Sequence, residues 1–264
     1  MSRRRLGAAG AAAALALAGV AAGCGSDGSG GTGTGASKPA LVVSAAKSLK
    51  AAFTGYGAAF PGATVRFQFA GSDELAAQIE QGVRPDVFAA ASTKLPDQLH
   101  RQGLVTAPVV FAGNRLVLAV PADAGRVSSL DDLSRSGVTV AIGAQGVPIG
   151  DYTRKVLARL PARTRATILG NVRTEEPDVG GIVGKLTQGA VDAGFVYATD
   201  VVASEGALRA IPLPASLQPV VAYGAAVVKG SKHPAAARAF IAGLLHGPGQ
   251  RALREAGFLP PPAP

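Results

Sequence analysis

The stretch Leu41 to Leu49, LVVSAAKSL, changes within a few residues from an apolar run typical of a buried strand to a helical pattern. A second stretch, Val65 to Leu75 (VRFQFAGSDEL), makes the same change. In each, a serine stands where the helix would begin, Ser48 in the first and Ser72 in the second. The first N–H groups of a helix have no partner within that helix. Two such helix ends that face each other could hold an anion without a charged side chain.

A structural alternative applies to each serine. Serine is among the preferred N-cap residues, because its hydroxyl can accept a hydrogen bond from the first turn. Either Ser48 or Ser72 by itself could therefore be an ordinary cap.

The rest of the chain alternates between strand-like and helical patterns, which predicts an α/β protein with mostly parallel sheets. In such sheets ligands bind at the carboxyl ends of the strands. We predict strands at Leu41 to Ala46, Val65 to Ala70, Val87 to Ala91, Arg115 to Val120, Val138 to Ile142, Ala193 to Tyr197 and Ala222 to Val228. We predict helices from Leu49 to Phe60, Leu75 to Glu80, Asp151 to Leu160, Val179 to Leu186 and Ala235 to Leu245.

Two further segments could present free backbone N–H groups at a helix start. In Val147 to Tyr152 (VPIGDY) a glycine-containing loop and a proline precede a helix, so the N–H of Ile149 could point outward. In Pro177 to Gly181 (PDVGG) the same order recurs, and its glycines let a ligand approach the backbone near Val179. Turns of this kind are mostly structural, so neither segment alone establishes a site.

Composition excludes several classes of protein. The 264 residues include one cysteine, three histidines and no tryptophan, which excludes a disulfide scaffold and argues against a histidine-rich metal centre. The net charge of +9 falls to +6 without Arg3, Arg4 and Arg5. The basic residues form no other run and aromatic residues are few, so we expect no binding to nucleic acid.

The N-terminal residues indicate export. A basic start, the apolar run Leu6 to Val20 and the small residues 21–23 together predict a secretory signal peptide over residues 1–23. Cys24 follows directly, as in a bacterial lipoprotein box, although Ala21 stands where that motif prefers leucine. We therefore expect Cys24 to carry a lipid anchor and residues 24–38 to form a flexible tether rich in Gly, Ser and Thr. The alternative is an unpaired thiol within an ordinary signal peptide.

Six segments in order give a specific resemblance over essentially the whole mature chain. They are AAKSL at 45–49, FAGSDELAAQI at 69–79, PDVF at 85–88, NRLV at 114–117, VPIGDY at 147–152 and FVYATD at 195–200. In this order they resemble the molybdate-binding proteins of bacterial ABC transporters.

The resemblance implies a binding site of neutral donors. It implies that Ser48 and Ser72 donate hydroxyl and backbone hydrogen bonds to the oxyanion, that Ile149 and Val179 contribute backbone N–H groups, and that Tyr197 contributes its hydroxyl. No side chain would bind the metal directly, and no cofactor is implied. Asp73 follows Ser72 where serine or glycine is more familiar. We expect its carboxylate to face solvent or the positive end of its own helix.

The resemblance also implies a two-lobed periplasmic-binding-protein fold with the ligand between the lobes. One lobe would comprise residues 39–118 and 221–264, and the other residues 119–220. The protein would be a monomeric, non-enzymatic lipoprotein on the extracytoplasmic face of the cell membrane. It would capture molybdate or tungstate, close by a hinge motion, and deliver the anion to an ABC transporter permease.

Three alternatives remain open at this point. A sulfate or phosphate receptor would share the architecture. An exported hydrolase could use Ser48 or Ser72 as nucleophile, although no G-x-S-x-G motif occurs. A surface lipoprotein without a ligand would make the order of the candidate segments a coincidence.

Overall fold

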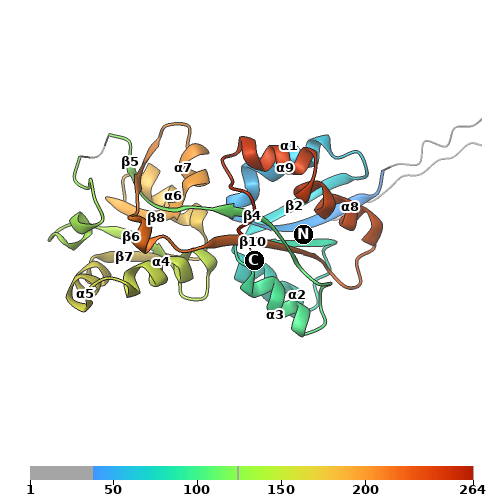
Figure 1. Ribbon diagram of the computed structural model, residues 1–264, viewed down its shortest axis with the longest axis horizontal. Helices are drawn as coiled ribbons and strands as arrows, with labels where there is room; N and C mark the ends of the chain where they lie inside the picture. Colours follow the sequence, from blue (N-terminus) through green and yellow to red (C-terminus); the bar gives the residue numbers. More distant parts are fainter. Residues whose placement is uncertain (1–37, 124, 264) are drawn as a thin grey trace, which may run out of the picture. The chain divides into compact units, whose positions relative to one another are not determined.

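The computed structural model describes residues 38–123 and 125–263. The predicted signal peptide, Cys24 and nearly all of the predicted tether therefore lie outside the described residues. Two five-stranded sheets with helices on both faces form two lobes, as Figure 1 shows. We call the part around the first sheet lobe I and the part around the second sheet lobe II. The predicted α/β, two-lobed fold class is confirmed.

The sheet of lobe I has the strand order β2-β1-β3-β10-β4. Strands β1 and β2 are parallel, β1 and β3 are parallel, and β10 is antiparallel to both of its neighbours. Four strands thus run in one direction and β10 runs against them. The bounds are β1 Ala40–Ala46, β2 Thr64–Ala70, β3 Val87–Ala90, β4 Val109–Asn114 and β10 Val221–Val227.

The sheet of lobe II repeats this plan with the order β7-β6-β8-β5-β9. Strand β6 is parallel to β7 and β8, and β5 is antiparallel to β8 and β9. Here β5 is the single reversed strand. The bounds are β5 Leu116–Pro121, β6 Val140–Gly143, β7 Val172–Glu176, β8 Ala193–Tyr197 and β9 Leu208–Pro212.

Helices cover both faces of each sheet (Figure 1). In lobe I they are α1 Lys50–Ala59, α2 Ser72–Glu80, α3 Lys94–Arg101, α8 Pro234–Leu245 and α9 Pro248–Glu255. In lobe II they are α4 Pro148–Ala158, α5 Ala162–Gly170, α6 Val179–Thr187 and α7 Ala198–Val202. Short 3₁₀ helices are η1 Lys47–Leu49, η2 Asp131–Ser134 and η3 Ala215–Leu217.

The alternation of side chains along β3 explains how one sheet supports two apolar layers. Val87 and Ala89 belong to the larger core cluster, which includes Phe53 of α1 and Phe240 of α8. Their neighbours Phe88 and Ala90 belong to a second cluster with α2 and α3. Because successive strand residues face opposite sides of a sheet, a strand buried on both faces is apolar throughout.

The chain passes between the lobes at two places. It leaves lobe I at Arg115, between the end of β4 and the start of β5, and it returns between β9 and β10. The reversed strand of each sheet is the one that follows a crossing, and both reversed strands meet the parallel ones in the middle of the sheet. The carboxyl ends of β1, β2 and β3 therefore lie at the edge of their sheet from which ligand-binding loops arise.

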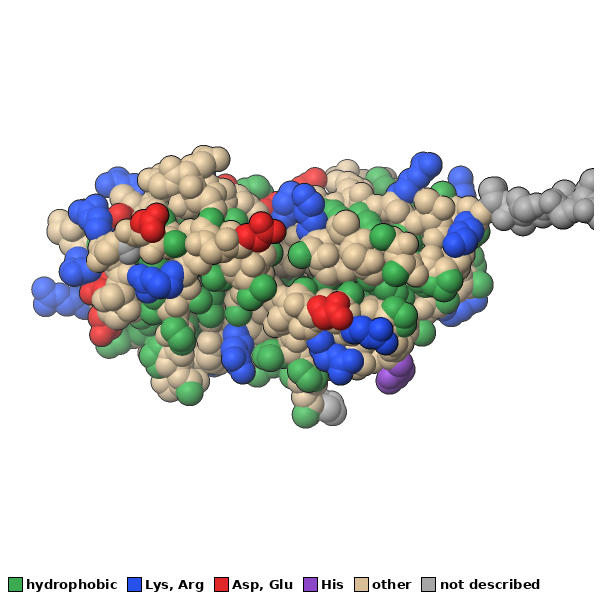
Figure 2. All heavy atoms as spheres, turned by 90° about the horizontal axis from the view of Figure 1, so that it is seen from above, with side chains coloured by type: hydrophobic (Ala, Val, Ile, Leu, Met, Phe, Trp, Pro, Cys, Tyr) green, Lys and Arg blue, Asp and Glu red, His purple; other side chains and the backbone are tan. Residues whose placement is uncertain are grey.

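The described surface carries dispersed charge. Figure 2 shows Lys and Arg side chains scattered over one face with Asp and Glu between them. Within residues 38–123 and 125–263, no helix combines the length and the apolar character needed to cross a membrane. The same residues include no group of three or more His, Cys, Asp or Glu side chains placed to hold a metal ion.

Candidate functional site

A small cavity lies where strand ends of the two lobes meet. All five residues predicted from the sequence line it, namely Ser48, Ser72, Ile149, Val179 and Tyr197. The volume of this cavity is about 20 Å³. The topology explains the convergence, since these residues follow or end β1, β2, β6, β7 and β8, the parallel strands of both sheets.

Ser72 is the first residue of α2, and its side chain does not cap that helix. Its Oγ instead accepts a hydrogen bond of 3.1 Å from the backbone N–H of Ala91, just after β3. Ser72 is 2% exposed. Since one lone pair of Oγ is occupied by a donor, the hydroxyl proton remains for a partner in the cavity. The N-cap interpretation is wrong for Ser72.

Ser48 lies inside η1, two residues before α1 begins, and makes no cap hydrogen bond either. Its Oγ lies 3.0 Å from the Oη of Tyr223, a residue of β10 that is 175 positions away in the chain. The N-cap interpretation is therefore wrong for Ser48 as well. Both hydroxyls are held by groups of lobe I at the edge of the cavity.

Ile149 and Val179 lie in the first turns of helices in lobe II. Ile149 is the second residue of α4, directly after Pro148, and Val179 is the first residue of α6. N–H groups in a first helical turn have no acceptor within the helix. The positive end of each helix dipole lies at the same place, so both positions favour an anion.

Glycines let the backbone approach closely at these helix starts. A Cβ at Gly150 would clash with the carbonyl oxygens of Gly143 and Ala144. The first turn of α4 therefore packs directly on the loop that follows β6. This contact fixes where the N–H of Ile149 lies.

The lobes also touch around the cavity. A Cβ at Gly71 would lie 2.6 Å from the carbonyl oxygen of Pro177 in the other lobe. The Nζ of Lys94 pairs with Oδ2 of Asp151 at 3.1 Å, again between lobes. These contacts define a closed arrangement of lobes I and II.

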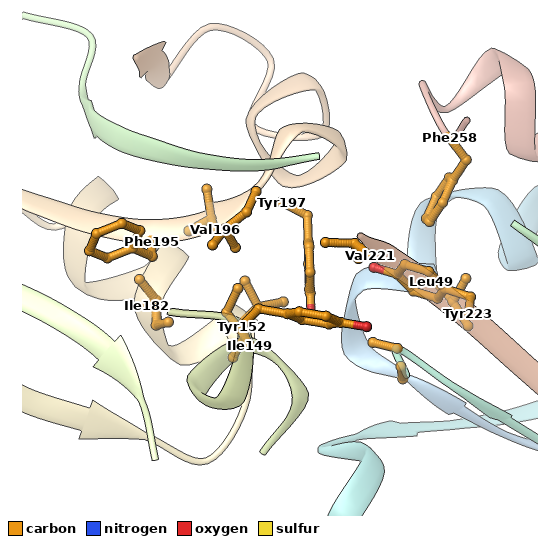
Figure 3. Close-up of a cluster of buried hydrophobic side chains, with 14 of the residues drawn as sticks. Leu49, Ile149, Tyr152, Ile182, Phe195, Val196, Tyr197, Val221, Tyr223 and Phe258 are labelled. Atoms are coloured by element: carbon orange, nitrogen blue, oxygen red, sulfur yellow. The ribbon is translucent and has the colours of Figure 1, made fainter. Parts of the chain in front are cut away.

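Tyr197 ends β8 and is 1% exposed. Among the described residues its hydroxyl has no hydrogen-bond partner, although it is buried. Burial raises the pKa of Tyr197 well above its usual range, and the nearby Tyr223 hydroxyl raises it further. The hydroxyl therefore remains a proton donor at neutral pH. Figure 3 shows its ring between those of Tyr152 and Tyr223, with centroid distances of 6.4 and 5.8 Å.

Two acidic residues lie at or beside the cavity, Asp178 in its lining and Asp73 next to Ser72. Asp178 caps α6, and its Oδ1 accepts a hydrogen bond of 3.1 Å from the N–H of Gly181. Asp73 lies in the first turn of α2, outside the cavity lining. Its Oδ1 is buried and has no partner among the described residues. Of the two orientations expected for this carboxylate, exposure to solvent is wrong for Oδ1. The other is met, because Asp73 lies at the positive end of its own helix.

Sequence reasoning missed the residues that hold the serines. Tyr223 and the N–H of Ala91 each contact one of the two hydroxyls. No local pattern marks either of them, because each contact joins segments distant in the sequence. Their positions follow only from the strand order β1-β3-β10.

The fold and the cavity define a class of protein, a two-lobed α/β protein with a cavity lined by residues of both lobes. The model of the bacterial extracellular solute-binding protein family matches residues 41–259. The chain belongs to this family.

Individual relatives agree with the assignment. The molybdate-binding protein ModA of Mycobacterium tuberculosis is 36% identical over 227 residues, which is 84% of this chain and 85% of the relative. The periplasmic molybdate-binding protein of Azotobacter vinelandii aligns with a TM-score of 0.74 at 24% identity, covering 84% of this chain and all of the other. The sulfate-binding protein SubI of M. tuberculosis aligns with a TM-score of 0.72 at 18% identity, covering 84% and 87%. These two structural matches show the shared fold.

The serine hydrolase alternative is wrong. The family consists of solute-binding proteins. The chain is therefore a binding protein rather than an enzyme.

Proposed function

We propose that this protein captures molybdate, and with it tungstate, outside the cytoplasm and delivers the anion to an ABC transporter permease. The observation that supports the proposal is that five residues able to donate hydrogen bonds line one cavity. Ser48, Ser72 and Tyr197 offer hydroxyls, and Ile149 and Val179 offer backbone N–H groups. Relatives named as molybdate-binding proteins support the choice of anion.

Neutral donors suit a dianion that has to be bound and later released. A hydrogen bond to a charged group contributes about 1.5–3 kcal/mol. Five such bonds bind strongly between residues that are all buried, and the proposal needs no ion pair with Lys or Arg. A charged partner would also slow release to the permease.

Selectivity follows from the spacing of the donors. Sulfate has the same charge and shape as molybdate but is smaller, so it cannot reach donors spaced for the larger ion all at once. Each buried donor left without a partner costs about 1–3 kcal/mol. We therefore expect molybdate and tungstate to bind alike and sulfate to bind at least about a hundredfold more weakly. A proton-bearing phosphate would bind more weakly still, because the ring of donors offers its hydroxyl no acceptor, unless the Asp73 carboxylate turns inward to supply one.

Calorimetric competition at neutral pH tests this function. Molybdate should bind with one-to-one stoichiometry, and tungstate should displace it at comparable concentration. Displacement by equal concentrations of sulfate would instead favour the sulfate-receptor alternative. Absence of binding by all four anions would favour the surface lipoprotein without a ligand.

We propose further that lobe I, residues 39–114 with 221–264, rotates against lobe II, residues 116–220, about the two crossing segments. The first boundary moves from the predicted 118/119 to Arg115, because Leu116–Leu118 pair with β8 in the sheet of lobe II. The anion would bridge the lobes, since Ser48 and Ser72 lie on one and Ile149 and Val179 on the other. Ligand-induced closure should appear as a smaller radius of gyration in X-ray scattering with molybdate than without it.

For the location we propose a monomer held at the membrane by a lipid on Cys24 after removal of residues 1–23. Cys24→Ala should block processing or release the protein from membranes while leaving molybdate affinity unchanged. Membrane fractionation followed by N-terminal sequencing distinguishes these results. Correct cleavage with full membrane retention of the variant would contradict a lipid anchor at this cysteine.

A further inference from the structure

A buried chain of polar side chains leads from the inter-lobe crossing to the cavity. Asn114, the last residue of β4, donates from Nδ2 to Thr199 Oγ1 at 2.9 Å and to Tyr223 Oη at 3.3 Å. Tyr223 Oη in turn lies 3.0 Å from Ser48 Oγ. Asn114 is 5% exposed, Tyr223 is fully buried and Ser48 is 8% exposed. Every member is therefore largely removed from water.

The direction of these hydrogen bonds is fixed from the crossing inward. The backbone N–H of Arg115 donates to Oδ1 of Asn114 at 2.8 Å, which assigns the oxygen of that amide. The other amide atom is then the NH₂ group, which can only donate. Tyr223 Oη consequently accepts from Asn114, and its own proton is left for Ser48.

Tyr223 keeps this proton at neutral pH. Burial raises the pKa of Tyr223 well above its usual range, and the nearby Asp200 carboxylate adds to the effect. Ser48 Oγ therefore accepts from Tyr223, and the Ser48 proton is free to point into the cavity. Ser72 reaches the same state by a different route, because its Oγ accepts from the N–H of Ala91.

We propose that Asn114 and Tyr223 act as positioning residues that orient Ser48 as a hydrogen-bond donor, and that this orientation makes the site select oxyanions carrying no proton. The inference rests on the proposed function, since it concerns the same cavity. A hydroxyl that already accepts from Tyr223 is polarised toward donation. It suits the oxygens of molybdate and opposes the hydroxyl of hydrogen phosphate, which needs an acceptor.

Tyr223→Phe tests the proposal, because it removes one hydroxyl and leaves the ring in the core. Ser48 then loses the donor that orients it, so its hydroxyl can rotate and present a lone pair to a ligand. Molybdate affinity should fall about tenfold, while hydrogen phosphate affinity should be unchanged or higher. The dissociation constant of hydrogen phosphate divided by that of molybdate should therefore fall at least about tenfold. Competition titrations at mildly alkaline pH measure this ratio.

Tyr56→Phe is the matched control. Tyr56 is buried in lobe I, and its hydroxyl donates to the carbonyl oxygen of Phe240 at 3.0 Å, away from the cavity. The control should lose a comparable amount of stability in thermal unfolding. Its ratio of dissociation constants should stay at the wild-type value.

Asn114→Asp provides a second variant, which should reverse the direction of the hydrogen bond between Tyr223 and Ser48. A carboxylate in place of the amide would attract the Tyr223 proton, so Tyr223 would accept from Ser48 and turn that proton away from the cavity. The loss of molybdate affinity should exceed that of Tyr223→Phe. If this variant does not fold, the result with Tyr223→Phe decides.

Two results would overturn the proposal: molybdate affinity of Tyr223→Phe within twofold of wild type, or an unchanged ratio. Where phosphate displaces molybdate from neither protein, the molybdate affinity of Tyr223→Phe decides. Failure of the proposed function is distinguishable. Wild-type protein would then bind sulfate rather than molybdate, and the same ratio would be measured with sulfate against hydrogen phosphate.

Discussion

The two sides of the cavity offer hydrogen-bond donors of different kinds. Lobe I contributes the hydroxyls of Ser48 and Ser72, each held by a hydrogen bond from elsewhere in that lobe. Lobe II contributes the backbone N–H groups of Ile149 and Val179 at helix starts, together with the Tyr197 hydroxyl. Side-chain donors depend on residue identity, whereas backbone donors depend on where the helix begins. The two sides should therefore respond to different substitutions.

The largest effect is expected where a backbone donor is displaced. Gly150→Ala places a Cβ against the carbonyl oxygens of Gly143 and Ala144, so the first turn of α4 has to move. We expect a loss of about 3 kcal/mol or more in the free energy of unfolding. Molybdate affinity should fall more than about a hundredfold, as followed by chemical unfolding and titration calorimetry.

Gly184→Ala is the control for this change. Gly184 lies in α6 with no atom within 4 Å of a Cβ placed there. Replacing a helical glycine by alanine stabilises by up to about 1 kcal/mol. Equal losses of molybdate affinity in Gly150→Ala and Gly184→Ala would show that the site does not depend on the start of α4.

An intermediate effect is expected on the side-chain donors. Ser48→Ala and Ser72→Ala each remove one hydrogen bond to a charged group, so each should weaken molybdate binding by about 1.5–3 kcal/mol, or roughly tenfold to somewhat over a hundredfold. Titration calorimetry measures both. Wild-type affinity in both variants would remove these serines from the site.

The stability of Ser72→Ala should also differ from that expected for the loss of a helix cap. Ser72→Ala leaves the buried N–H of Ala91 without its acceptor, which costs about 1–3 kcal/mol of stability. Thermal unfolding without ligand measures this term separately from binding.

The smallest effect is expected when a backbone donor loses only part of its side chain. Ile149 is 2% exposed, so Ile149→Val should cost about 0.5–1.5 kcal/mol of stability. Its N–H is unchanged, and molybdate affinity should stay within about threefold of wild type. A loss as large as that of Ser72→Ala would contradict a backbone role for this residue.

The six central strands and the edge strand β2 could be predicted from the sequence, but the other three edge strands could not. All seven predicted strands are present with ends shifted by a few residues at most. The three missed strands, β4, β7 and β9, are all edge strands. Strand β7, VRTEE, is exposed on alternate residues and carries no apolar run. Edge strands bury less surface, so the apolar signal on which the prediction relied is weaker there.

The missed helices have similar causes. Helix α3 carries Pro96 in its first turn, α5 directly follows Pro161, α9 begins at a proline, and α7 is five residues long. A proline is compatible with the first turn of a helix, but in a sequence-based prediction it indicates the end of a helix. None of these helices provides one of the five predicted donors.

The residues of the candidate site could be predicted from the sequence, but the contacts that hold them could not. Ser48, Ser72, Ile149 and Val179 stand at changes from strand to helix, which the sequence shows directly. Tyr223 and Asn114 lie 175 and 66 positions from Ser48, and only the pairing of β10 with β3 and β4 brings them near. The order of strands in a sheet is a tertiary property that local patterns do not encode.

The most direct test of the account is an anomalous difference map from crystals of the protein grown with molybdate. We predict one strong peak in the cavity, with anion oxygens within hydrogen-bond distance of the Ser48 and Ser72 hydroxyls, the Tyr197 hydroxyl and the N–H groups of Ile149 and Val179. An anion held instead by Lys or Arg side chains, or a cavity without a peak at saturating molybdate, would contradict the account.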